Sequence, residues 1–205
     1  ALELLMKDIY DLGYFVFDLE TDSLNVIDAN LIGVAICLSV KRSYYIPLAH
    51  KDEDGKIIEE QIDFKEALKQ LNNILSNSSL IKIGHNIKYD IAVLKRYKID
   101  VVSFEDTMLM SYINDAGNHR HGMDELAKVH FNRDTIKFKD VVGTGKSQIT
   151  FDYVEIEKAI EYAAEDAEIT FKLYLLLKKK LSEEKNISAY SYLEKPLVAS
   201  ILEME

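Results

Sequence analysis

The sequence has few residues of the kinds that interrupt or cross-link a chain. Its 205 residues include 8 glycines, 2 prolines, 1 cysteine and no tryptophan. The scarcity of glycine and proline excludes long disordered linkers, and the single Cys37 excludes a disulfide within the chain. Cys37 lies in an apolar run, so we expect it to be buried. These features predict one ordered domain in a reducing, cytoplasmic setting.

Long apolar runs and an excess of positive charge are also missing. The longest run, LIGVAICLSV at 31–40, is too short to cross a bilayer. The N-terminus shows no basic-then-apolar export pattern, so we expect no membrane contact and no export. The 25 basic and 35 acidic residues give a net charge of −10. That balance excludes a protein that grips nucleic acid by its overall charge, so any such partner must be held locally.

The hydrophobic pattern predicts an α/β domain, because strand-like and helix-like stretches alternate. We expect strands at 14–20, 31–40, 43–48 and 80–84, the first three forming an antiparallel meander. A helix is expected at 63–75, where Asp63 and Glu66 form a capping-box pattern. Further helices are expected around 89–97, twice within 104–131, and from about 153 to 184 with Asp152 as N-cap.

Two acidic stretches place carboxylates where a sheet ends. In FDLETDSL, Asp18 and Glu20 are two residues apart on a predicted strand, so both side chains point from one face. In GHNIKYD, Asp90 follows a buried strand at the start of a helix, a position where α/β sheets bind ligands. We expect Asp90 to face Asp18 and Glu20.

A third acidic stretch, YAAED, lies on the long helix. Tyr162 and Asp166 are four residues apart, so a hydroxyl and a carboxylate lie on one face, one turn from each other. Glu165 and Glu168 are rotated away, and we expect them to face solvent. The helix therefore offers one further carboxylate to the group formed by the other two stretches.

Four carboxylates that converge require counter-charge. Asp18, Glu20, Asp90 and Asp166 together carry −4, which two divalent cations balance. Oxygen ligands favour hard ions such as Mg²⁺ or Mn²⁺, and a pair of these ions suits phosphodiester hydrolysis. The alternative is that each acid is an ordinary turn, helix-start or surface residue. Against it, an unpaired buried carboxylate costs several kcal/mol.

Two other motifs suggest ligand sites but lack their context. GTGKS at 143–147 resembles the end of a phosphate loop, yet Asp140 stands where that pattern needs glycine. We interpret it as a flexible loop. HRH at 119–121 suggests zinc, but no cysteine or further histidine stands at the usual ligand spacing. We interpret it as a polar loop.

FDLETDSL, GHNIKYDIAVL and YAAEDAEIT resemble the three exonuclease motifs of the DEDD superfamily, in its tyrosine-bearing branch. The resemblance is strongest to the proofreading exonuclease domains of bacterial family A DNA polymerases, the DNA polymerase I type. It extends over nearly the whole chain, including DTMLMSYI, HGMDELAKVHF and GKSQITF between the second and third motifs. Small departures at Leu19, Gly84 and His85 leave the carboxylates unchanged.

The resemblance implies a ribonuclease-H-like fold, a five-stranded mixed sheet flanked by α-helices. It implies an exonuclease domain over 1–186, with 187–205 starting the connection to a covalently linked polymerase domain. The implied activity is 3′–5′ exodeoxyribonuclease, acting at single-stranded DNA 3′ ends and releasing nucleoside 5′-monophosphates. A monomer in the bacterial cytoplasm, working at the nucleoid, is expected. Alternatives are a ribonuclease D-like exoribonuclease and an inactive exonuclease-like scaffold of a polymerase.

The resemblance also implies roles for single residues. Asp18, Glu20 and Asp166 would bind a first metal ion, Asp18 would touch a second, and Asp90 would hold the second ion's waters. The two ions would be Mg²⁺, with Mn²⁺ or Zn²⁺ as substitutes at one position. Tyr162 would orient the attacking water. The substrate contacts would be Thr21, Leu24, Asn86, Tyr89 and Phe138, of which Leu24 and Phe138 could instead be ordinary core residues.

Overall fold

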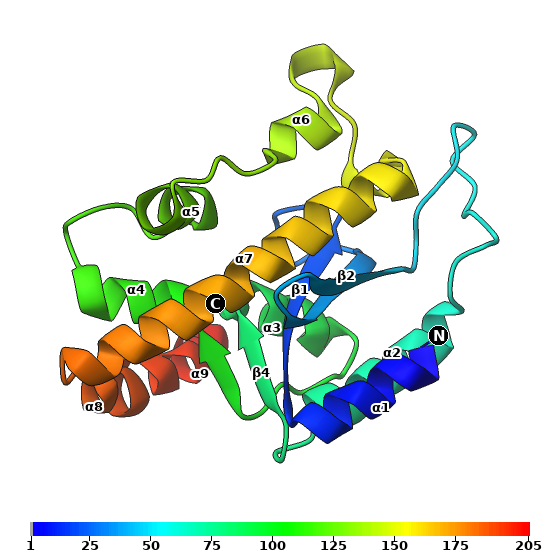
Figure 1. Cartoon of the computed structure of the whole chain (residues 1–205). Helices are drawn as coiled ribbons and strands as arrows, with labels where there is room; N and C mark the ends of the chain where they lie inside the picture. Colours follow the sequence, from blue (N-terminus) through cyan, green and yellow to red (C-terminus); the bar gives the residue numbers. More distant parts are fainter. Residues whose placement is uncertain (1) are drawn as a thin grey trace.

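A five-stranded mixed sheet organises the chain, for which a computed structural model describes residues 2–205 (Figure 1). The strand order is β3-β2-β1-β4-β5; β1, β2 and β3 are antiparallel neighbours, whereas β4 runs parallel to β1 and β5 parallel to β4. The predicted fold class and the predicted meander are therefore confirmed. The strands are β1 (Tyr14–Thr21), β2 (Leu31–Ser39), β3 (Arg42–Pro47), β4 (Ile81–Gly84) and β5 (Phe104–Asp106).

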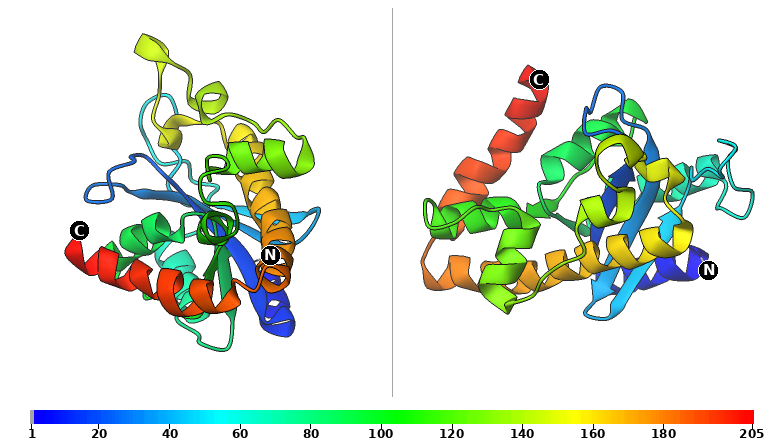
Figure 2. Two further views of the ribbon diagram at one scale, coloured as in Figure 1. Left: turned by 90° about the vertical axis from the view of Figure 1, so that its left-hand side faces the viewer. Right: turned by 90° about the horizontal axis from the view of Figure 1, so that it is seen from above.

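Helices cover both faces of the sheet. One face packs against α1, α2 and α3, and the other packs against α4, α5 and the long helix α7. The segment from α5 to α6 lies alongside α7 (Figures 1 and 2). The helices are α1 (Leu2–Leu12), α2 (Phe64–Leu75), α3 (Ile87–Arg96), α4 (Thr107–Asp115), α5 (Met123–Phe131), α6 (Phe138–Val142), α7 (Ile156–Glu183), α8 (Ile187–Ala189) and α9 (Lys195–Met204).

The alternation of β1 sends its residues into two different environments. Phe15, Phe17 and Leu19 enter the core beneath α1, α2 and α3, whereas Val16 enters the core beneath α7. Asp18 and Glu20 share the parity of Val16, so they point toward the α7 face. A strand buried on both sides thus carries its two acids toward the helix that bears Asp166.

Two helix starts test the capping predictions. Asp63 caps α2, since its carboxylate accepts the Glu66 backbone N–H at 2.9 Å. Asp152 does not cap α7, which begins at Ile156 after Glu155. Asp152 instead lies in a 3₁₀ turn that precedes the helix, and its carboxylate pairs with Lys51 at 2.7 Å. Burial of the neighbouring Phe151 in the core holds this turn in place. The predicted Asp152 cap is therefore wrong.

The two ends of the chain add helices to the predicted sheet and helices. The sequence analysis made no prediction for α1, which buries Leu5, Met6 and Ile9 against the sheet. Residues 187–205 pack onto the domain: Tyr190 is buried, and its hydroxyl accepts the Asp106 N–H at 2.9 Å. Within residues 2–205 no helix combines the length and apolar character needed to span a bilayer.

Gly33 on β2 leaves room for a tyrosine ring next to the strand that bears the acids. Gly33 pairs with Glu20 of β1, and a Cβ at position 33 would lie 2.0 Å from the Tyr45 hydroxyl. The ring is held in place, because the Tyr45 hydroxyl bonds His50 Nε2 at 2.7 Å while His50 Nδ1 donates to the Val154 carbonyl at 2.9 Å. A side chain here therefore forces the ring or the strand to move.

We expect Gly33→Ala to lower the free energy of unfolding by about 1–3 kcal/mol, the usual cost of overpacking. Urea unfolding followed by circular dichroism measures the change. In a Tyr45→Ala background the cost of Gly33→Ala should largely disappear, because the clashing ring is gone. The same cost in both backgrounds would show that the clash is not the cause.

Candidate active site

Three of the predicted acids, from two elements, line one cavity of about 590 Å³, which Asp22 also lines. Asp18 and Glu20 reach it from β1, and Asp166 reaches it from the middle of α7. Glu20 and Asp166 are only 6% and 8% exposed. The predicted convergence of the first and third acidic stretches is what the structure shows.

Asp90 lies behind this cavity, near the start of α3. Its side chain is buried, and Oδ1 accepts the backbone N–H of Leu19 at 3.2 Å. That bond fixes Asp90 against β1 between the two strand acids. The charge of Asp90 helps to raise the pKa of Glu20, and the charge of Asp18 helps to raise the pKa of Asp90. The structure thus brings all four predicted carboxylates into one neighbourhood.

Burial and mutual repulsion make these carboxyl groups hard to ionise. Burial raises the pKa of Asp18 to about 7. Burial also raises the pKa of Glu20 well above its ordinary value, and the charges of Asp18, Asp166 and Asp90 raise it further. The pKa values of Asp90 and Asp166 are raised first by burial and next by the charge of Asp18.

The cavity that these acids share has no basic side chain to offset their charges. Among the described residues that line the cavity there is no lysine or arginine, and Glu20 Oε1 is buried without a hydrogen-bond partner. An orphaned carboxylate oxygen in an all-carboxylate site fits a hard divalent cation. Within residues 2–205 the one group of three ligand atoms lying within 4.8 Å of each other is elsewhere. No three of the four acids therefore bring their oxygens that close together, a spacing that repulsion between like charges favours.

Tyr162 stands one helical turn before Asp166 and lines the same cavity. Its ring lies 6.0 Å from Phe151 and 6.1 Å from Phe138, centroid to centroid. Burial raises the pKa of Tyr162, and the charges of Asp166 and Glu20 raise it further. The phenol therefore stays protonated at neutral pH and can donate a hydrogen bond.

The predicted substrate contacts fall into two groups. Thr21, Leu24, Tyr89 and Phe138 line the cavity. Leu24 is 87% exposed and Phe138 is 41% exposed, so the alternative that they are ordinary core residues is wrong. The Tyr89 hydroxyl lies 2.5 Å from Thr21 Oγ1 and 2.5 Å from the Ser23 carbonyl, which it donates to. Tyr89 thereby ties α3 to the turn that carries Leu24.

Asn86 is the predicted contact that does not line this cavity. It precedes α3 in a left-handed conformation with φ of 57°, and its backbone N–H donates to Asp106 at 3.2 Å. Its exposed side chain lines a separate small pocket beside α9. Whether Asn86 contacts a substrate stays a prediction.

The structure adds residues that the sequence patterns did not single out. These come from the start of α5 and from the segment before α7, where no acidic motif drew attention to them: Met123, Gln148, Ile149, Thr150 and Phe151. The available signal was the family resemblance of the stretches HGMDELAKVHF and GKSQITF, which contain these residues.

Glu165 and Glu168 do not face solvent as predicted. Glu165 is 11% exposed at its side chain, pairs with Arg133 and accepts the Ile136 backbone N–H at 2.7 Å. Glu168 is 17% exposed and pairs with Lys172. The reason is that residues 132–137 pass over this part of α7, which helical geometry alone cannot reveal. Glu165 thereby holds the segment leading to Phe138 on the helix.

Comparison with known proteins assigns the chain to a family. A family model described as 3′-5′ exonuclease matches residues 1–182. The chain is 39% identical over 219 residues to DNA polymerase I of Rhizobium leguminosarum and 35% identical over 205 residues to that of Pseudomonas aeruginosa. The chain belongs to the 3′–5′ exonuclease family of DNA polymerase I. The resemblance seen in the three motifs is therefore confirmed.

These relatives are much longer than the chain. The matches cover 100% and 98% of the chain but 22% of each relative. The fold is also similar to Brucella melitensis NrnC with bound Mg²⁺ (TM-score 0.69, 20% identity, 96% of this chain and 87% of that chain). It is similar to Escherichia coli RNase D (TM-score 0.71, 15% identity, 98% and 48%). At these identities the likeness supports the ribonuclease-H-like fold alone.

The raised pKa values predict an unusual pH dependence for the metal-free domain. A carboxyl group with a folded pKa above its unfolded value binds more protons in the folded state, so stability falls as pH rises between the two values. With chelator present, we expect the free energy of unfolding to fall by a few kcal/mol between about pH 4 and pH 7. Thermal or urea unfolding across this range measures it.

Asp18→Asn removes one of the repelling charges and is the matched comparison. The variant should lose less stability than the parent over the same pH range, so the two should differ most at pH 7 and above. A parent domain whose stability rises steadily from pH 4 to pH 7 would contradict the assigned repulsion.

Proposed function

We propose that the chain is an editing domain that removes nucleotides one at a time from the 3′ end of single-stranded DNA, releasing nucleoside 5′-monophosphates. The observation that carries the proposal is one cavity lined by Asp18, Glu20 and Asp166, with buried Asp90 behind it and no lysine or arginine among the described lining residues. Membership of the 3′–5′ exonuclease family supports it. So does the similarity to DNA polymerase I of two bacteria.

The acids fit a pair of Mg²⁺ ions. Asp18, Glu20 and Asp166 would hold the first ion; Asp18 would also touch the second, whose waters Asp90 would hold. Bound divalent ions supply two kinds of help to phosphodiester hydrolysis, activation of a water and stabilisation of the leaving oxygen. Mn²⁺ or Zn²⁺ are substitutes at one position. The orphaned Glu20 Oε1 supports this assignment.

Tyr162 has the chemistry of a hydrogen-bond donor beside the acids. Because burial and neighbouring charges raise its pKa, the phenol keeps its proton and does not act as a base at neutral pH. Donating to the attacking water or to a phosphate oxygen, it would orient the reacting atoms. Its ring contacts with Phe138 and Phe151 fix that direction.

Exposed apolar groups at the cavity edge suit unpaired bases. Leu24 and Phe138 present apolar surface to solvent, and stacking on such groups contributes about 1–3 kcal/mol per base without regard to sequence. Indifference to sequence is what an editing enzyme requires. Thr21, Tyr89 and Asn86 would contact the sugar and phosphate groups of the same strand.

The net charge of −10 limits how the domain holds DNA. A covalently linked polymerase domain would supply the grip on the duplex, and residues 187–205 would begin the connection to it. The exonuclease domain would occupy residues 1–186 of a monomer that works at the nucleoid in the bacterial cytoplasm. We expect the isolated domain to bind single strands weakly and to degrade them nevertheless.

Digestion of matched DNA and RNA oligonucleotides tests the proposed substrate. With Mg²⁺ present, we expect the single-stranded DNA to shorten from its 3′ end to mononucleotides, faster than the RNA of the same sequence. Gel separation of 5′-labelled strands shows both direction and rate. Faster digestion of RNA would favour a ribonuclease D-like enzyme, and tight binding without cleavage would favour an inactive scaffold.

Asp166→Ala tests the catalytic assignment. We expect the rate to fall by at least about 10²–10³-fold, the usual loss when one electrostatic contribution to a transition state is removed. Folding stability should hold or rise, because a repelling buried charge is removed along with a ligand.

Glu161→Ala is the matched control, because Glu161 is an exposed acid on the same helix, five residues earlier. It should digest DNA within twofold of the parent rate. Loss of folding in Asp166→Ala, or equal rates in both variants, would show that Asp166 has a structural role instead.

A further inference from the structure

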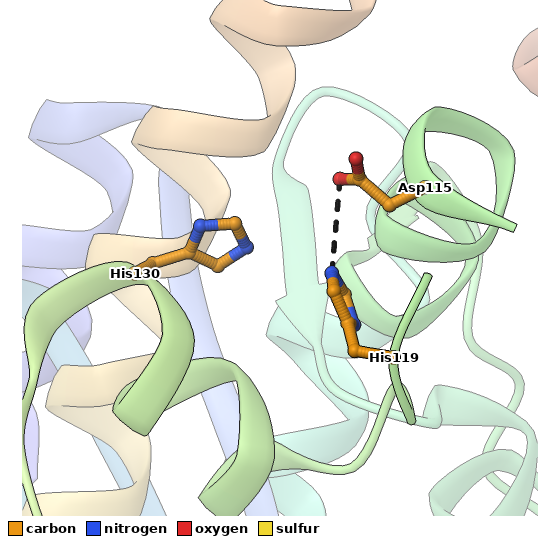
Figure 3. Close-up of side chains that lie close together, drawn as sticks. All are labelled: Asp115, His119 and His130. Atoms are coloured by element: carbon orange, nitrogen blue, oxygen red, sulfur yellow. Dashed lines mark ion pairs between the residues drawn. The ribbon is translucent and has the colours of Figure 1, made fainter. Parts of the chain in front are cut away.

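A second cluster of ligand-type side chains lies apart from the acid cavity. Asp115 ends α4, His119 follows in the loop, and His130 lies near the end of α5. One donor atom from each lies within 4.8 Å of the others, and Figure 3 shows the three side chains facing one another. The HRH stretch lies in a loop, as predicted, but the α4–α5 hairpin brings His130 to it, which sequence spacing did not indicate.

The hydrogen bonds leave two imidazole nitrogens free for an ion. His119 Nδ1 donates to the Arg120 carbonyl at 2.8 Å, so Nε2 keeps a lone pair and stands 4.0 Å from Asp115 Oδ2. Metal-binding histidines commonly donate their other ring N–H to a carbonyl in this way. His130 Nε2 is buried without a hydrogen-bond partner, and a ring nitrogen of His130 points toward Asp115 and His119 (Figure 3).

We propose that Asp115, His119 and His130 bind a transition-metal ion of the Zn²⁺ class, with water as a fourth ligand. Imidazole nitrogen favours zinc and its neighbours over Mg²⁺, and three protein ligands plus water is a common zinc arrangement. With metal–ligand bonds of about 2.0–2.2 Å, two ligand atoms of a tetrahedral site stand about 3.3–3.6 Å apart. Closing the present separations around an ion requires side-chain shifts of less than about 1 Å.

Lys180 is the one competing cation at this cluster among the described residues. Its Nζ lies 2.6 and 2.7 Å from the two oxygens of Asp115. Each carboxylate oxygen has two lone pairs, so Asp115 Oδ2 keeps one for the ion beside His119. The rival account is a simple ion pair of protonated His119 with Asp115. That ion pair would place a second positive charge on Asp115, whose charge Lys180 already neutralises. It would also leave His130 Nε2 without a hydrogen-bond partner.

An ion here would hold in place the helix and loop that form one side of the acid cavity. It would tie the end of α4 and the end of α5 to the loop between them. That loop leads into Met123, which lines the acid cavity. Arg120 and Gly122 line an adjoining cavity with Tyr162 and Asp166. The ion's effect would thus be on the position of α5 and its loop, separate from the carboxylates that would hold Mg²⁺.

Co²⁺ is the probe, because its visible absorption reports the coordination around it. The chain is stripped of metal with a chelator, supplied with excess Mg²⁺ to occupy the carboxylates, and titrated with Co²⁺. We expect one Co²⁺ bound per chain with absorption typical of nitrogen-containing tetrahedral coordination. Bound Co²⁺ or Zn²⁺ should also raise the unfolding temperature, since ligands that bind the folded state stabilise it.

Variants of single histidines locate the site. His119→Gln and His130→Gln should each weaken Co²⁺ binding at least about tenfold. The matched control is His121→Gln in the same loop, whose ring bonds Ser111 at 2.9 Å and which is not one of the three ligands. It should bind within twofold of the parent. Unfolding of the metal-free variants checks their folding; if a glutamine variant does not fold, the alanine variant replaces it.

A second comparison separates this site from the acid cavity. Asp18→Asn should abolish DNA digestion and leave Co²⁺ binding in excess Mg²⁺ unchanged. Three results would overturn the proposal: no Co²⁺ uptake by the parent chain in excess Mg²⁺, equal loss in His121→Gln and His119→Gln, or loss of uptake in Asp18→Asn. None of these results bears on whether the domain digests DNA.

Discussion

Repulsion among buried carboxylates is the constraint on which the rest of this structure depends. Asp18, Glu20, Asp90 and Asp166 are drawn together by a strand, a helix start and a long helix, and their pKa values rise because burial and neighbouring charge oppose ionisation. The fold must hold this arrangement against its own electrostatics. Hydrophobic packing on both faces of the sheet supplies the opposing free energy.

The parts around the acids serve to hold them or to shape the space beside them. The Leu19 N–H fixes Asp90, Gly33 admits Tyr45 beside the strand that carries Glu20, and Glu165 holds the segment that leads to Phe138. These contacts come from elements far apart in the chain. Among the described residues, no lysine or arginine lines the cavity; under the proposed function, such a side chain would compete with the metal ions for the same oxygens.

The α4–α5 region shows how one chain can present two ligand chemistries at neighbouring places. The cavity offers carboxylate oxygens, whereas the cluster at the far end of α5 offers two imidazoles and one carboxylate. Ligand type distinguishes the two, since oxygen donors select hard ions and imidazole nitrogen selects zinc-class ions. A metal bound at the second place would act on the first only through the position of the helix and loop between them.

The sequence by itself determined the strand that carries Asp18 and Glu20, the α2 cap at Asp63, the Tyr162–Asp166 pair and, through three motifs, the family. These features depend on local periodicity or on a spacing of two to four residues, which short-range geometry fixes. Only the tertiary structure decided the rest: Asp152 pairing with Lys51, Glu165 buried under the passing 132–137 segment, Leu24 left exposed, and His130 brought to His119. Each of these depends on contacts between distant segments, and local spacing contains no information about which segments meet.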